Sequence, residues 1–165
     1  MSLAGLYISI KVISGSCDDA VKQLIRCVNT HKCIGVLVSG CGDSHKEVRT
    51  QCGIYLAQLI SQYNVTYGSS TDNESINKLS AFDSQLDVIC DTVCKYIGDG
   101  DKDVRSSHRQ IFDALYCNER TRTYADRMFN TFSAAIQRTI EAERRTNSKK
   151  KLNKRKKNIS TSSIQ

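Results

Sequence analysis

The stretch Gly42-Asp43-Ser44-His45-Lys46-Glu47-Val48-Arg49 decides the fold, because it returns 56 residues later as Gly98-Asp99-Gly100-Asp101-Lys102-Asp103-Val104-Arg105. Each copy follows an apolar run with helical spacing and is followed by another such run. A helix, a short polar turn and a second helix, used at least twice, are the unit of a helical solenoid. The sequence therefore predicts an all-α fold, an α-solenoid of antiparallel helix pairs.

Apolar stripes with a period near 3.6 residues define the helices of these pairs. The clearest stripe runs through Val48, Cys52, Tyr55, Leu56, Leu59 and Tyr63. We expect Val48 and Val104 in the core, and Cys94 and Ala135 on the inward faces of their helices. The predicted helices span residues 16–29, 31–41, 46–63, 83–97, 103–117 and, as a cap over the end of the array, about 120 to beyond 142. The polar segment 64–80 lacks periodicity and is predicted to be a surface loop.

The net charge of +7 comes from the end of the chain. Nine of the 24 basic residues lie between Arg144 and Lys157, where there is no acidic residue, so the rest of the chain carries 15 basic against 17 acidic residues. This distribution predicts a nearly neutral domain over residues 1–145 and a basic, disordered tail over residues 146–165. The basic residues of the tail are Lys149, Lys150, Lys151, Lys154, Arg155, Lys156 and Lys157.

The sequence offers no sign of catalysis. The cysteines and histidines have no metal-ligand spacing, and neither a phosphate-binding loop nor a nucleophile motif occurs, so we predict no enzyme, no cofactor and no metal site. Of the eight cysteines, Cys27, Cys41, Cys52, Cys90 and Cys94 fall on or beside the apolar stripes, which favours buried free thiols over disulfides. No segment has the length and hydropathy of a membrane span or of a signal peptide.

The turns and the last predicted helix together resemble a known family. The Asp-x-x-x-x-Val-Arg turns between paired helices look like HEAT repeats of a TOG domain, and the cytoplasmic-linker-associated proteins (CLASP) are the most similar class. The resemblance covers most of residues 11–143, but only the C-terminal part of such a domain, because the early Trp-bearing repeats have no counterpart here. It rests on residues 11–17 through 25–26, 29–34 through 48–49, 101–105, 124–132 and 135–138.

The resemblance implies that the chain binds αβ-tubulin or the microtubule through its helix-pair turns, around Lys11–Ser16 and at Asp43–Arg49 and Asp99–Arg105. The implied contact residues are Lys11, Lys46, Arg49, Lys102 and Arg105. Basic groups at these positions suit an acidic partner. For Arg49 and Arg105, pairing with an aspartate of a neighbouring repeat is an equally good interpretation; for Lys46 and Lys102 we favour partner contact. The implied location is the cytoplasm, on the microtubule cytoskeleton or spindle.

The basic tail leaves several alternatives open. Contact with a polyanion, first of all the acidic tails of tubulin, is our first interpretation, and a nuclear localisation signal is the second. Under the second, the chain would be a generic HEAT-repeat adaptor for another protein. Nucleic-acid binding comes last, because no aromatic residues are interleaved with the basic ones for base stacking.

Overall fold

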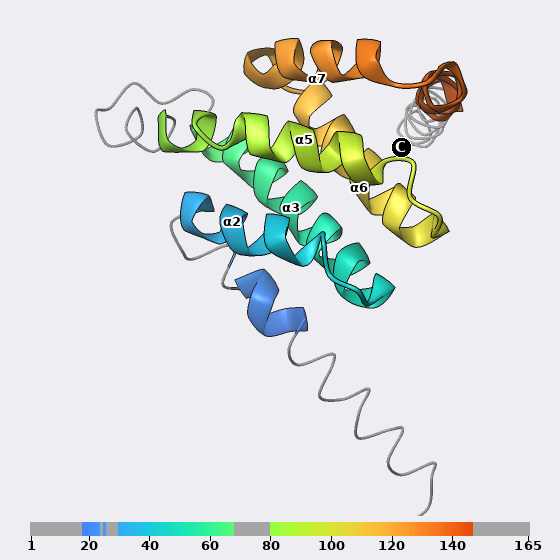
Figure 1. Ribbon diagram of the computed structural model, residues 1–165. Helices are drawn as coiled ribbons and strands as arrows, with labels where there is room; N and C mark the ends of the chain where they lie inside the picture. Colours follow the sequence, from blue (N-terminus) through green and yellow to red (C-terminus); the bar gives the residue numbers. More distant parts are fainter. Residues whose placement is uncertain (1–17, 24, 26–29, 68–79, 147–165) are drawn as a thin grey trace, which may run out of the picture.

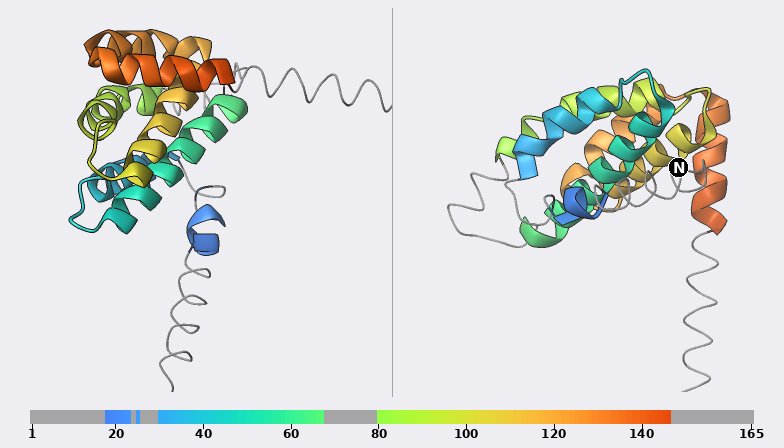
Figure 2. Two further views of the ribbon diagram at one scale, coloured as in Figure 1. Left: turned by 90° about the vertical axis from the view of Figure 1, so that its right-hand side faces the viewer. Right: turned by 90° about the horizontal axis from the view of Figure 1, so that it is seen from below.

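The computed structural model describes residues 18–23, 25, 30–67 and 80–146. Throughout these ranges the regular structure is helical and no strand is present, which confirms the all-α prediction. The helices form two layers, with α2 (Thr30–Gly40) and α5 (Leu86–Tyr96) in one and α3 (Lys46–Tyr67) and α6 (Lys102–Tyr116) in the other (Figures 1 and 2).

Two helix hairpins build these layers. Helix α2 packs against α3 and α5 against α6, while α3 lies along α6 and joins the two hairpins. The turns that close the hairpins are the repeated octapeptides, which we call the first corner (residues 42–49) and the second corner (residues 98–105). Both lie at the right-hand side of Figure 1. The repeat in the sequence therefore corresponds to a repeat in the structure.

The apolar stripes form one continuous core between the layers. Burying an aliphatic side chain stabilises the fold by roughly 1.5–3 kcal/mol, so these stripes hold the hairpins together. The largest fully buried side chains include Leu56, Leu59, Ile60, Leu86, Ile89, Ile111, Phe112 and Leu115.

A glycine sets how closely α3 and α6 approach each other. Gly53 is buried in α3, and a Cβ placed there would lie 2.4 Å from Ser107 Oγ and 2.9 Å from Ser107 Cβ. Only a residue without a side chain fits at this distance. The close contact brings the two corners next to each other at one end of the pair.

The last predicted helix is two helices, and this prediction was wrong. Helix α7 (Glu119–Thr131) begins at the N-cap Asn118 and ends at Phe132, whose backbone is extended (ψ 148°); a second helix spans residues 134–146. The buried Phe132 ring packs against Phe112 with an edge contact at 5.5 Å between ring centroids. This packing turns the chain, so Ala135 is exposed instead of inward. The stripe alone did not indicate the break, since neither Gly nor Pro occurs there.

Helix α7 lies over α5 and α6, across the end of the stack (Figure 1). The helix at 134–146 lies against α6: Arg109 Nη1 donates to Glu143 Oε1 at 2.7 Å, and the Arg144 guanidinium lies 3.5 Å from the centre of the Tyr116 ring. The end of the helix stack is therefore covered by two helices, α7 and the helix at 134–146, instead of one long capping helix.

Three smaller predictions also need correction. Helix α3 runs to Tyr67, four residues into the predicted loop, and residues 68–79 lie outside the described part. Near its end, the buried Tyr63 ring stacks on Phe82 with 4.0 Å between the ring centroids. Val48 is 40% exposed although Val104 is fully buried. Cys94 is exposed at the border of the apolar stripe, 3.8 Å from Thr131 Oγ1, because Cys90 and Val93 take the inward positions.

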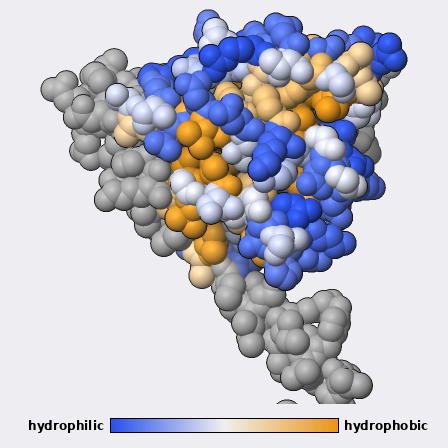
Figure 3. All heavy atoms as spheres, in the orientation of Figure 1, coloured by the Kyte–Doolittle hydropathy of each residue, from blue (hydrophilic) through white to orange (hydrophobic). Residues whose placement is uncertain are grey.

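Apolar side chains also reach the surface. Val36 of α2 and Val88 of α5 are 73% and 46% exposed, and Figure 3 shows apolar groups over these two helices. Across the ranges that the structure describes, no helix combines the length and apolar character needed to cross a membrane.

Candidate functional site

Two ion pairs join the first corner to the second. Lys46 Nζ lies 3.7 Å from Asp101 Oδ2, and Arg49 Nη2 lies 3.6 Å from Asp99 Oδ1. In both pairs the cation comes from the first corner and the carboxylate from the second. Lys46, Arg49, Lys102 and Arg105 therefore belong to one continuous edge of the molecule. Lys11, the remaining predicted contact residue, lies outside the described residues.

Within each corner an arginine ties the turn together. Arg49 Nη1 donates to the carbonyl oxygens of Asp43 and Ser44, both at 3.0 Å. Arg105 Nη1 donates to the carbonyl oxygens of Asp99 and Gly100, at 2.6 and 3.0 Å. The two arginines thus have the same structural role within their own turns. The expected pairing with an aspartate of the neighbouring repeat is seen for Arg49, which faces Asp99, whereas the two bonds of Arg105 lie within its own turn.

The leading aspartate of each corner has an equivalent role as well. Asp43 Oδ1 accepts from the backbone N–H of His45, and Asp99 Oδ1 accepts from that of Asp101, both at 2.8 Å. The bond from His45 is the main reason that the pKa of the Asp43 carboxyl lies below its usual range. The carboxylate is therefore ionised at neutral pH, as a turn-capping acceptor should be.

The two lysines differ in their surroundings. The Lys46 side chain is 59% exposed but faces Asp101, whereas Lys102 is exposed and forms no ion pair within the part of the chain that the structure describes. The two corners hold Lys46, Arg49, Lys102 and Arg105 against Asp43, Glu47, Asp99, Asp101 and Asp103. The edge is therefore mixed in charge, not basic as its turn lysines suggested, and Lys102 is an exposed cation on it that has no ion-pair partner among the described residues.

A buried histidine one helical turn after the second corner contacts the backbone of that corner. His108 is fully buried, its Nδ1 lies 2.9 Å from the Val104 carbonyl oxygen, and its ring lies 5.3 Å from that of Tyr96. Burial is the main cause that lowers the pKa of His108 below its usual value of 6.5. The imidazole is therefore neutral at pH 7, with Nδ1 donating to Val104.

The sequence of the chain matches the family model described as CLASP N terminal over residues 6–141. The chain belongs to this family. A search of the curated proteins gave no match. The match covers both corners and the helices that carry them, so the edge built above is a feature of a CLASP N-terminal domain.

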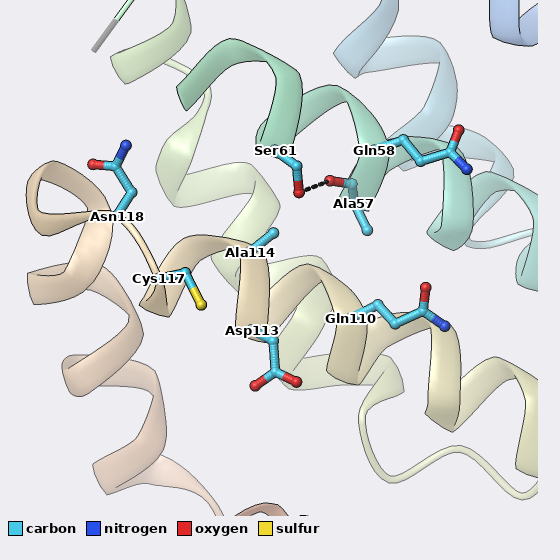
Figure 4. A pocket seen from close by; sticks show the side chains of 8 residues that line it. All are labelled: Ala57, Gln58, Ser61, Gln110, Asp113, Ala114, Cys117 and Asn118. Carbon is cyan, nitrogen blue, oxygen red and sulfur yellow. Dashed lines mark hydrogen bonds between the residues drawn. The ribbon is translucent and has the colours of Figure 1, made fainter. Parts of the chain in front are cut away.

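This CLASP N-terminal domain also has an open groove that the sequence did not indicate. It has a volume of about 730 Å³ and runs between α3 and α6 on the side away from α2 and α5 (Figure 4). Its walls are small or polar side chains, and burial raises the pKa of Asp113, its one carboxyl group. One carboxyl and one exposed thiol are not a catalytic set. The lining residues are Ala57, Gln58, Ser61, Gln110, Asp113, Ala114, Cys117 and Asn118.

The thiols that the structure describes are free. Cys41 and Cys90 are buried as predicted, and burial raises their pKa values to about 12 and about 11, which makes these thiols inert. Cys27 lies outside the described residues. Where the structure describes the chain, no three His, Cys, Asp or Glu side chains are placed to hold a metal ion.

Proposed function

We propose that this domain is a non-enzymatic tubulin-binding module of the CLASP type, which contacts αβ-tubulin or the microtubule through the edge formed by its two corners. The family match supports a microtubule-associated role for the chain. The observation that carries the choice of edge is the pair of contacts Lys46–Asp101 and Arg49–Asp99, because they align the two corners side by side.

The described contacts give the four corner cations different roles in this proposal. Arg49 and Arg105 fix the shape of the corners through backbone carbonyl groups. Lys102 presents a charge to the partner, and Lys46 does so after leaving Asp101. Because tubulin is acidic, such contacts orient the encounter and raise the association rate more than they raise the final affinity. We place the module on the microtubule cytoskeleton accordingly.

Co-sedimentation with microtubules tests the proposal. Lys102→Glu should weaken pelleting of the full chain about tenfold, because it places a carboxylate opposite the acidic surface of tubulin, where the two negative charges repel each other. Arg122→Glu is the control for the same change of charge: Arg122 is an exposed cation at the start of α7, at the far end of α6 from the corners. Its guanidinium also donates to Tyr116 Oη and lies over the Tyr116 ring, so the melting temperature of this variant is measured alongside. Equal pelleting of wild type, Lys102→Glu and Arg122→Glu would exclude the corner edge as the site.

The basic tail has a separate test. Its residues Lys149 to Lys157 lie outside the described part of the chain, and we propose that they assist binding through the acidic tails of tubulin. Removing residues 147–165 should weaken pelleting and reduce its dependence on salt, because salt screens the attraction between basic and acidic residues. Binding that depends on the tail but is unchanged by Lys102→Glu would favour a polyanion-binding tail over a corner edge.

A further inference from the structure

Asp101 has two tasks, one for each oxygen of its carboxylate. Oδ1 caps α6 by accepting from the backbone N–H groups of Asp103 and Val104, at 2.8 and 3.3 Å. Oδ2 faces Lys46 Nζ at 3.7 Å. These N-cap bonds are the main reason that the pKa of Asp101 lies below its usual range, so the group is an anion at neutral pH. The cap holds this anion in place beside the lysine.

The lysine is the movable member of the pair. The Asp101 side chain is 25% exposed and fixed at the helix end, whereas the Lys46 side chain is 59% exposed on a four-carbon stem. A hollow of about 290 Å³ opens between the two corners beside this pair, and its walls hold one cation, Lys46, against three carboxylates. Its lining residues are Lys46, Glu47, Thr50, Gln51, Asp101 and Asp103.

We propose that Asp101 competes inside the molecule with the partner's carboxylates for Lys46 and so limits the affinity of the corner edge. This inference rests on the proposed function. To contact an acidic partner, the Lys46 ammonium group must leave Asp101. The free energy needed to break this ion pair makes binding weaker by the same amount. Exposed ion pairs are weak, so removing the competitor should tighten binding about two- to fivefold.

The substitution Asp101→Asn separates the two tasks. Asparagine caps a helix about as well as aspartate, so α6 keeps its N-cap while Lys46 loses its ion pair. Asp103→Asn is the matched control, because Asp103 lines the same hollow and its neutralisation changes the net charge equally, but it forms no ion pair with Lys46 within the described residues. Both changes are made in the full chain.

The experiment is microtubule co-sedimentation of these variants, repeated in a Lys46→Ala background. We expect Asp101→Asn to tighten binding two- to fivefold beyond the gain from Asp103→Asn, and we expect this excess to vanish when Lys46 is alanine. An equal gain from both variants, or an excess that persists without Lys46, would overturn the inference and leave the proposed function standing. A wild-type chain that does not pellet would overturn both.

Discussion

The first and second corners of this domain make the same bonds within themselves but have different surroundings. In both, an arginine donates to two backbone carbonyl groups and an aspartate accepts from the N–H two residues on. Yet Val104 is fully buried and Val48 is 40% exposed. The second corner also has Asp101 as a helix N-cap, where the first has His45. The octapeptide therefore determines the hydrogen bonds within each turn, whereas the burial of its valine depends on the helices that pack around it.

The largest expected difference between the corners is in the core. Val104→Ala should lower the free energy of unfolding by about 2 kcal/mol, because two buried methyl groups are lost and a cavity remains. Val48→Ala should change it by less than about 0.5 kcal/mol, because the side chain is partly in water already. Urea denaturation of the two variants measures both. If both variants lose the same free energy of unfolding, the side chain of Val48 is packed as closely as that of Val104.

The arginines should matter in both corners, and more in the first. Replacing Arg105 by Lys keeps the charge but removes the forked donor, which should cost about 1 kcal/mol. Arg49→Lys should cost somewhat more, because Arg49 also faces Asp99 across the two corners. Thermal unfolding at low salt compares the pair. If Arg49→Lys costs no more than Arg105→Lys, the guanidinium of Arg49 adds nothing to the contact with Asp99 beyond what an ammonium group supplies.

The third difference depends on pH. His108 occupies the position that Cys52 has in the first repeat. Burial lowers the pKa of His108, so below pH 6.5 the unfolded chain binds a proton that the folded chain does not. The free energy of unfolding should therefore fall as the pH drops below about 6.5, with a slope of at most about 1.4 kcal/mol per pH unit.

The variant His108→Cys copies the first repeat into the second and is the control for this effect. Urea denaturation at intervals between pH 5 and pH 8 should give it a flatter profile than the wild type. Identical slopes for the two proteins would show that another group titrates in this range.

The sequence predicted the repeated unit because the unit is local. The turn residues and the helical stripes lie within a few positions of each other, and the helices that flank the corners appear where the stripes indicated. Val48 shows what a local pattern cannot predict. It is the same residue type at the same position of the octapeptide as Val104, but the burial of its side chain depends on the helices that pack around it. The break at Phe132 has the same cause, because the aromatic packing that turns the chain lies in Phe112 of another helix.

The candidate site was predictable only in part. The sequence placed Lys46, Arg49, Lys102 and Arg105 in turns, and the resemblance gave these turns a role. The pairing of Lys46 with Asp101 depends on the close approach of α3 to α6 at Gly53, which no local pattern reveals. The charges on one corner are therefore understood only together with those on the other.

Hydrogen–deuterium exchange of the chain, free and bound to αβ-tubulin, tests the central claim most directly. Our account predicts that binding slows amide exchange in both corners, at residues 43–49 and 99–105. It predicts no change in the exchange rates of residues 57–61 and 110–118, which line the groove between α3 and α6. Slower exchange in that groove or on the exposed face of α2 and α5, with both corners unchanged, would contradict it.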